Sequence, residues 1–262
     1  MDPALRAAAT GMAAQQTRVE VIANNLANVN TPGFKRSRAH FEDLLYQMAQ
    51  GAAAVGGPAA TTLPAIQVGR GTRLAAVQRI ETQGPIEQTG RPLDLAIEGA
   101  GYFQVQLPNG TIAYTRDGSF MISDQGTLVT HGGYTVLPGI DIPPDAMSIT
   151  ISRNGVVTVE AAGQTEPIEI GRIELARFAN PAGLLALGEN LFAETPASGP
   201  AIIGYAQEDG FGRIIQGSLE ASNVEIVQEM VDMIAALRAY EINSKAVKAS
   251  EDMAEITNGM VR

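Results

Sequence analysis

The stretch Ala23–Lys35 reads ANNLANVNTPGFK and marks the point where a helical sequence pattern stops. Asparagine is a poor helix former, because its side-chain amide competes with the backbone for hydrogen bonds. Asn28 and Asn30 therefore fit a helix end. The pair Thr31-Pro32 enforces that end, since the residue before a proline is pushed out of the α-helical region. This stretch predicts a long N-terminal helix that ends in a tight turn.

Two further asparagines, Asn24 and Asn25, stand inside the helical pattern and not at its end. Helix termination does not explain them. We interpret their side-chain amides as contacts between subunits. Gly33 follows the proline and permits the turn that the chain needs there.

The residues before this stretch repeat with a period of seven. Between Pro3 and Val29 there is one glycine, Gly11, and no further proline. One row of the repeat consists of Leu5, Met12, Val19 and Leu26, and the other of Ala8, Gln15, Ile22 and Val29. Two rows at this spacing are the a and d positions of a heptad pattern. They predict an N-terminal core helix within residues 1–35.

The C-terminal end of the chain carries the same kind of pattern. The run from Val224 to Thr257 contains no glycine or proline, and Ser222 to Glu225 fits a capping box that starts a helix. The apolar row at spacing seven is Ile226, Met233, Tyr240, Val247 and Ala254, with Met230 and Leu237 between its members. This pattern predicts a C-terminal core helix within residues 218–262.

An apolar stripe on a helix has to be covered. We predict that the two ends pair, through a seam formed by Leu5, Met12, Val19, Ile22, Leu26, Ile226, Met230, Met233, Leu237, Tyr240 and Val247. Residues 1–40 carry five basic and two acidic side chains, whereas residues 222–262 carry four basic and seven acidic ones, which favours this pairing. The pair either closes within a monomer or leaves apolar surface for other copies of the chain.

The middle of the chain has turn signals at short intervals. They are Pro108–Gly110, Arg116–Gly118, Asp124–Gly126, His131–Gly133 and Arg153–Gly155. Short strand-like runs between such turns indicate an antiparallel meander. We therefore predict an α+β protein with long N- and C-terminal helices paired as a coiled-coil-like domain and a β-rich antiparallel middle domain. The middle domain is expected over residues 73–217, with a connector and arm over residues 36–72.

Composition excludes several classes of function. The 262 residues include no cysteine and two histidines, which removes disulfides, thiolate metal sites and multi-histidine metal sites. A net charge of −10 argues against binding to nucleic acid or to an anionic membrane. We see no secretory signal and no membrane-spanning segment. We expect no metal and no cofactor.

The most catalytic-looking group of residues is Asp117, Ser119 and His131. Asp117-Gly118 also fits a hairpin turn, with Ser119 in the next strand and His131 in a glycine turn. We favour this structural interpretation and predict no catalytic residue. A wall-cleaving enzyme would require an acid with a raised pKa in a cleft. Besides a structural protein and an enzyme, the third alternative is a monomeric binding module. A protein of that class would not form a polymer.

The run Gly51–Thr62 contains only Gly, Ala, Val, Pro and Thr. Composition alone favours a flexible linker. The alternative is an extended arm that packs against a neighbouring copy of the chain.

The stretch Ala23–Lys35 closely resembles the N-terminal signature of the flagellar rod and hook protein family. Ser222–Val224 and Arg238–Lys245, which read SNV and RAYEINSK, resemble its C-terminal signature. The residues that carry the match are Asn24, Asn25, Asn28, Thr31, Gly33, Phe34, Ser222, Asn223, Arg238, Tyr240, Asn243 and Lys245. Segments of the middle that extend it are Gly99–Val105, Tyr114–Phe120, Phe178–Leu184 and Gly188–Phe192. The resemblance covers nearly the whole chain.

Within this family, the runs FEDLLYQ at Phe41–Gln47 and RAYEINSKAV at Arg238–Val247 resemble subunits of the distal rod. A proximal rod or hook subunit is the alternative. The resemblance implies a structural subunit that self-assembles into a straight, hollow drive shaft and transmits torque from motor to hook. It also implies a segment at about Tyr46–Arg70 that keeps the rod straight, so we favour the arm for Gly51–Thr62.

The resemblance further implies where the protein works and with what. The expected partners are other copies of the chain, the proximal rod proteins, the hook protein, the ring proteins of the periplasm and outer membrane, and the flagellar type III export apparatus. No nucleic acid and no direct membrane insertion are expected. The expected location is the basal body of the bacterial flagellum, spanning the periplasm, after export without a cleaved signal peptide.

Overall fold

The computed structural model describes residues 3–50, 53–55, 61–63, 66–161 and 166–260. It shows an α+β fold with a helix at each end and antiparallel strands between them, as the sequence predicts. The chain forms two compact units. Unit 1 comprises Met1–Leu26, Ser37–Gln78 and Glu225–Arg262, and unit 2 comprises Ala27–Arg36 and Arg79–Val224.

The N-terminal helix of unit 1 is α1 (Pro3–Ala27). It ends one residue before Asn28, whose backbone oxygen accepts a hydrogen bond from the Thr31 amide at 3.2 Å. The Thr31 hydroxyl also donates to the Asn28 side chain at 3.2 Å. The predicted helix end is confirmed, because Asn28 and Thr31 bond each other in place of the next helical turn.

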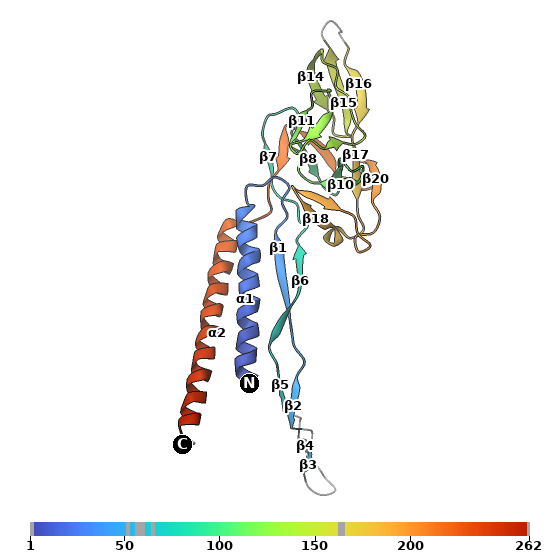
Figure 1. Cartoon of the computed structure of the whole chain (residues 1–262). Helices are drawn as coiled ribbons and strands as arrows, with labels where there is room; N and C mark the ends of the chain where they lie inside the picture. The colour runs from blue at the N-terminus through green and yellow to red at the C-terminus, as the bar shows by residue number, and fades with distance from the viewer. Residues whose placement is uncertain (1–2, 51–52, 56–60, 64–65, 162–165, 261–262) are drawn as a thin grey trace. The chain divides into compact units, whose positions relative to one another are not determined.

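The C-terminal helix is α2 (Ile226–Met260), and it runs antiparallel to α1 (Figure 1). The predicted capping box is wrong. The Ser222 hydroxyl accepts a hydrogen bond from the Val224 amide at 3.3 Å, which caps a turn before the helix. At the start of α2, the backbone amide of Glu229 donates a hydrogen bond to the backbone oxygen of Glu225 at 3.0 Å. The helix therefore starts later than the sequence pattern indicated.

The rest of unit 1 is a long two-stranded ribbon, hereafter the arm. Its strands are β1 (Ser37–Asp43), β2 (Gln47–Gln50), β3 (Ala53–Val55), β4 (Thr61–Leu63), β5 (Ile66–Val68) and β6 (Thr72–Arg79). β1 pairs with β6, β2 with β5 and β3 with β4. The strand β6 completes the arm, although residues from Arg73 onward were expected in the middle domain. Of the run Gly51–Thr62, only residues 53–55 and 61–62 lie among the described residues.

The arm lies beside α1 (Figure 1). The Thr72 amide donates a hydrogen bond to the Thr10 hydroxyl of α1 at 3.2 Å. Gly71 comes so close to the helix that a Cβ atom built on it would lie 2.1 Å from the Thr10 oxygen. Gly71 also has a positive φ of 107°, a conformation that favours glycine.

Unit 2 contains the β-rich middle of the chain. Its elements are β7 (Ile86–Gln88), β8 (Leu95–Glu98), β9 (Tyr102–Gln106), β10 (Ile112–Thr115), β11 (Phe120–Ile122), β12 (Leu128–Thr130), β13 (Thr135–Val136), β14 (Ala146–Ile151), β15 (Val156–Ala161), β16 (Ile168–Arg172), β17 (Glu174–Arg177), a 3₁₀ turn at Pro181–Gly183, β18 (Leu185–Gly188), β19 (Leu191–Ala193), β20 (Ile202–Tyr205), β21 (Arg213–Gln216) and β22 (Ser218–Glu220).

Antiparallel pairing joins these strands into several sheets. The largest has the order β11-β12-β13-β9-β10-β19-β18, with β17 pairing to β9 and β20 to β17. A second sheet consists of β14, β15 and β16, and two strand pairs, β21 with β8 and β22 with β7, complete the unit. The main apolar core contains Leu95, Ile97, Phe103, Val105, Phe120, Ile173, Leu175 and Ile214. Its rings Phe103 and Phe120 meet edge to face at 5.0 Å.

Gly33 fixes the turn that follows α1 to the backbone of unit 2. Its φ is +69°, and its amide donates a hydrogen bond to the Glu220 backbone oxygen at 2.7 Å. A Cβ atom on residue 33 would lie 2.7 Å from the backbone carbon of Arg116 and from the nitrogen of Asp117. A glycine is required here for its conformation and for the close approach of two backbones.

A buried ion pair holds the end of the same stretch. The Lys35 ammonium lies 2.5 Å from Oε1 of Glu220, and both side chains are excluded from solvent. The Gly84 amide donates to the same carboxylate oxygen at 3.0 Å, and Nη1 of Arg116 lies 3.4 Å from Oε2. Burial lowers the pKa of the Lys35 ammonium, and the attraction of Glu220 only partly offsets this. The carboxylate of Glu220 therefore takes the place of the water that would surround an exposed lysine.

Replacing Glu220 with glutamine should destabilise unit 2 by about 3 kcal/mol, because the Lys35 ammonium stays buried without its counter-charge. Urea denaturation of the full chain measures this. The matched control is Glu98→Gln, since Glu98 also faces a cation, Arg213, at 2.5 Å but is exposed. Water screens that exposed pair, so the control should denature close to the unsubstituted protein. Equal losses in both variants would contradict the buried pair.

Gly33→Ala should cost more stability than Gly90→Ala. Both glycines have a positive φ, 69° and 74°, so each substitution carries about 1 kcal/mol of backbone strain. A Cβ on Gly90 meets nothing within 4 Å, whereas one on Gly33 meets rigid backbone. The clash should add about 2 kcal/mol to the loss at Gly33, read from the same denaturation curves. Equal losses would show that the turn yields.

Candidate self-assembly surface

A hydrogen bond and an ion pair link α1 to α2. The Asn25 amide nitrogen donates a hydrogen bond to Oε2 of Glu229 at 3.0 Å, where both side chains are buried. Farther along, Nη2 of Arg18 lies 3.4 Å from Oδ1 of Asp232. These contacts lie on one side of each helix and run in the antiparallel sense.

A close approach of the two helices continues this contact. A Cβ atom built on Gly11 would lie 2.9 Å from the side-chain nitrogen of Asn243, so a glycine makes room for that amide. Gly11 with Asn243, and Asn25 with Glu229, are two heptads apart on both helices. We call these residues the polar row: Gly11, Arg18, Asn25, Glu229, Asp232 and Asn243.

The residues of α2 that are buried follow the same row. They are Glu229, Ala236 and Ser250, at spacing seven with Asn243 between the last two. On α1 the buried residues include Ala14 and Ile22. Small and polar residues thus line the helix contact, and small side chains allow helix axes to approach closely.

Part of the predicted seam is exposed in the single chain. Ile226, Met230, Leu237 and Tyr240 are between 41% and 51% exposed, so α1 of the same chain does not cover them. Of the other predicted residues, Ile22 is buried, and Leu5, Met12, Val19, Leu26, Met233 and Val247 are half-buried. The sequence pattern showed which residues need cover, but the chain covers another face. The role of these residues in contacts between copies stays a prediction.

Exposed apolar residues occur along much of α2, and four of them form a continuous strip near its start. Ile226, Met230, Ile234 and Leu237 follow each other at helical spacing and are all exposed. We call these four residues the apolar flank. A continuous apolar strip of this kind on a helix surface marks a site of protein–protein contact.

Asn25 works within the chain, in contrast to the predicted contact between subunits. Its Oδ1 accepts a hydrogen bond from the Ser37 amide at 2.8 Å, and its Nδ2 donates to the Ser37 oxygen at 2.8 Å. The same Nδ2 reaches Glu229. One buried side chain therefore joins α1, the arm and α2. The neighbouring Asn24 is exposed, and its predicted role in contacts between subunits stays a prediction.

Asn223 has the corresponding role in unit 2. Its Oδ1 accepts a hydrogen bond from the Arg36 amide at 2.7 Å, and its Nδ2 donates to the backbone oxygens of Ile80 and Thr82 at 2.8 Å and 3.0 Å. The Asn223 amide also donates to the Phe34 oxygen at 3.4 Å. Asn223 thus joins three segments of unit 2 that continue into unit 1 along the chain.

Four of the signature residues lie on α2. Arg238, Tyr240 and Lys245 are exposed there, whereas Asn243 is half-buried against Gly11. Their exposure suits contacts with another molecule, which the single chain does not show.

The arm also exposes apolar side chains. Leu45 is 88% exposed, and Tyr46, Met48, Val68, Leu74 and Val77 are exposed as well. A two-stranded ribbon is only marginally stable in water on its own. The arm therefore offers a second apolar surface that another molecule can cover.

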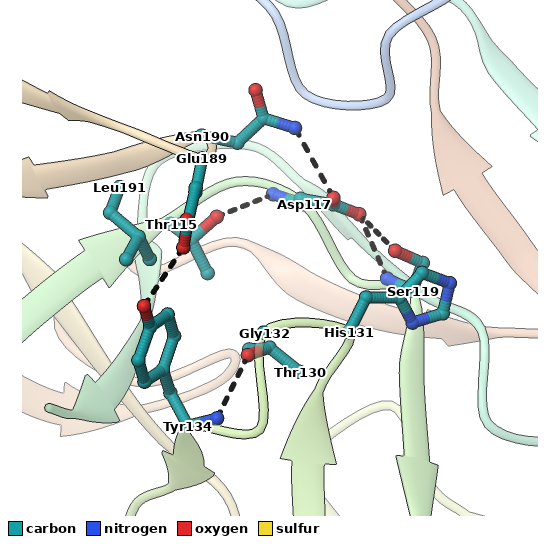
Figure 2. Close-up of a pocket in the computed structure, with 10 residues that line it drawn as sticks. All are labelled: Thr115, Asp117, Ser119, Thr130, His131, Gly132, Tyr134, Glu189, Asn190 and Leu191. Atoms are coloured by element: carbon teal, nitrogen blue, oxygen red, sulfur yellow. Dashed lines mark hydrogen bonds between the residues drawn. The ribbon is translucent and has the colours of Figure 1, made fainter. Parts of the chain in front are cut away.

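The group Asp117, Ser119 and His131 lines a pocket of about 240 Å³ in unit 2 (Figure 2). The Ser119 hydroxyl donates its hydrogen bond to Oδ1 of Asp117 at 2.6 Å, and the Ser119 amide binds the same oxygen. That hydroxyl proton is directed to a carboxylate and not to an imidazole, so the arrangement is a turn and not an activated nucleophile. Within the described ranges, no three or more acidic or histidine side chains are placed to hold a metal ion.

Among the described residues, neither helix combines the length and apolarity needed to cross a membrane.

Three family models match the chain. They are described as the flagella basal body rod protein, over residues 5–35, the flagellar hook protein FlgE/F/G D1 domain, over residues 96–159, and the flagellar basal body rod FlgEFG protein C-terminal region, over residues 215–260. The first and third contain the two signatures, and the second lies in unit 2.

Curated relatives match over the whole length. The flagellar basal-body rod protein FlgG of Borreliella burgdorferi is 54% identical over 264 residues, which cover 99% of this chain and 98% of the relative. FlgG of Caulobacter vibrioides is 50% identical, over 97% of this chain and 98% of the relative. FlgF of the same organism is 35% identical, over 100% of this chain and 97% of the relative. The similarity to FlgG is thus higher than that to FlgF.

The two signatures, the three family models and the full-length relatives agree. The chain belongs to the family of flagellar basal-body rod proteins, which are structural subunits and not enzymes.

Proposed function

We propose that this protein is the subunit of the distal rod, a straight hollow shaft that transmits torque from the motor to the hook. The observation that carries this proposal is the apolar flank of α2, which stays exposed on a helix that buries a polar face. A subunit built in this way leaves its apolar surface to other copies. The higher identity to FlgG than to FlgF favours the distal rod over the proximal rod alternative.

The proposed contact between copies consists of the predicted seam residues that the single chain leaves exposed or half-buried. The exposed ones are Ile226, Met230, Leu237 and Tyr240, joined by Ile234. Burying a leucine or isoleucine side chain contributes about 2 kcal/mol. Repeated in every copy, these side chains hold a polymer together side to side, although each of them contributes a modest free energy.

The arm is the proposed stiffening element. Its strands pair along their length, and its exposed Leu45 and Met48 offer a place for neighbouring copies to pack. An extended ribbon that bridges copies resists bending, because curvature would stretch the bridge on one side of the shaft. The arm contains the segment at about Tyr46–Arg70, which the family resemblance implies keeps the rod straight.

The proposed partners follow from the same family. They are the proximal rod proteins and the hook protein at the two ends of the shaft, the ring proteins of the periplasm and outer membrane around it, and the flagellar type III apparatus that exports the chain. The proposed location is the part of the basal body that spans the periplasm, reached without a cleaved signal peptide.

Leu237→Asp should abolish polymer formation without unfolding the chain. Leu237 is exposed in the single chain, so the aspartate meets water there, but it would be a buried charge in the contact between copies and cost several kcal/mol. Sedimentation and negative-stain images of the concentrated full chain measure the polymer, and a thermal melt measures the fold. The control Ala235→Asp places the same charge on another exposed side of α2 and should still polymerise. Straight polymers from Leu237→Asp would refute the contact.

Removing residues 46–70 and closing the arm with a short turn should give curved polymers. The shaft contact on α2 stays intact in this variant, so polymer still forms, but the proposed bridge between copies is lost. Curvature is measured on negative-stain images. The control exchanges two exposed polar residues of the arm, Gln47→Ser and Gln67→Ser, and should leave the polymer straight. Straight polymers from the shortened chain would argue that stiffness resides elsewhere.

A further inference from the structure

The pairing of α1 and α2 inverts the usual arrangement of an amphipathic helix. Such a helix turns its apolar stripe inward and its polar face to water. Here α2 buries the carboxylate of Glu229, which is 2% exposed, and leaves the apolar flank in solvent. Two further contacts of the polar row follow along the helix pair. They are the ion pair of Arg18 with Asp232 and the close approach of Gly11 to Asn243.

Stability alone does not account for this choice. Replacing a buried polar or ionic contact with apolar side chains of similar volume is often neutral or stabilising. An alternative packing exists in the sequence. Met230, Leu237 and Ser244 each follow by one residue a member of the row that faces α1, which is Glu229, Ala236 and Asn243. Successive residues of a helix are about 100° apart around its axis. Rotating α2 by about 100° would therefore turn the row of Met230, Leu237 and Ser244 toward α1. That rotated pair would bury Met230 and Leu237 within the chain.

We propose that Glu229 is a positioning residue that fixes the rotation of α2 about its axis. Its hydrogen bond from Asn25 is made only when the polar row faces α1. In the rotated pair the Glu229 carboxylate no longer accepts the hydrogen bond from Asn25. Met230 and Leu237 of the apolar flank are then buried against α1 of the same chain. Glu229 thereby keeps the flank available to a second copy of the chain. This inference rests on the proposed function for the identity of that partner, but the rotation itself does not depend on it.

Asn25 suits this role because its side chain is held by a segment other than α2. Two hydrogen bonds tie its side chain to the backbone of Ser37 at 2.8 Å each, which leaves Nδ2 aimed at Glu229. A partner held in this way gives a directional reference, which apolar contacts do not provide. Buried polar groups are known to select one helix packing among several in this manner, at a cost in stability.

The absence of cysteine from the chain allows a direct test by engineered disulfides. The pair Gly11→Cys with Asn243→Cys reports the observed rotation, because a Cβ on residue 11 lies 3.2 Å from Cγ of Asn243, within the short reach of a disulfide. The pair Gly11→Cys with Ser244→Cys reports the rotated helix. The full chain is oxidised below the concentration at which it polymerises, and an intramolecular bond is recognised as a faster band on a denaturing gel.

Each reporter pair is combined with Glu229→Leu or with the conservative Glu229→Gln, whose amide oxygen still accepts the bond from Asn25. In the native background and in Glu229→Gln the 11–243 pair should form preferentially. In Glu229→Leu the preference should shift to the 11–244 pair. The thermal midpoint should stay the same or rise. Polymer yield should fall by about tenfold or more, since losing even one of Met230 and Leu237 from the contact changes its association constant by about that factor.

The readouts separate this inference from the proposed function. A Glu229→Leu variant that keeps the 11–243 preference, or that melts at a lower temperature without any shift between the pairs, overturns the positioning role. Equal formation of both pairs in the native background also overturns it. The assembly of Leu237→Asp tests the contact between copies. If that variant polymerises while the disulfide preference shifts as expected, the rotation is right and the proposed contact is wrong.

Discussion

The hydrogen bonds of Asn25 are the contacts on which unit 1 depends. A single buried amide binds the backbone of Ser37 on both sides and reaches the carboxylate of Glu229. It therefore determines how the arm leaves α1 and which face of α2 meets α1. An apolar side chain at this position could fill the space but could not specify either direction, because hydrophobic contacts are not directional.

A second asparagine repeats this arrangement one peptide away. The Arg36 amide donates to Asn223 in unit 2, and the next amide along the chain, that of Ser37, donates to Asn25 in unit 1. The chain thus passes from one unit to the other between two consecutive peptides that are each held by a buried or half-buried asparagine. The side chains that grip it come from the two signatures at opposite ends of the sequence.

Sequence reasoning predicted the elements well and their contacts less well. The two helices, their approximate ends and the antiparallel middle followed from periodicity and turn residues, which are local signals. The arm was open to two interpretations, because a run of Gly, Ala and Thr without charge is compatible with both linker and strand. Lys35, Arg116 and Glu220 were not foreseen as a buried cluster, since their partnership joins residues far apart in the chain. The row Glu229, Ala236 and Asn243 was visible at spacing seven but carried no hydrophobic signal.

The exposure of part of the predicted seam has a physical reason that applies to subunits of polymers in general. A heptad pattern identifies the side chains that need to leave water, but it does not identify the molecule that covers them. In a monomer the cover comes from the same chain, and the pattern then predicts internal packing. Here small and polar residues line the contact between α1 and α2, and Met230 and Leu237 stay exposed. In this chain the row of small and polar residues lies in the contact inside the subunit, and the apolar row is the one that we propose for the contact between copies.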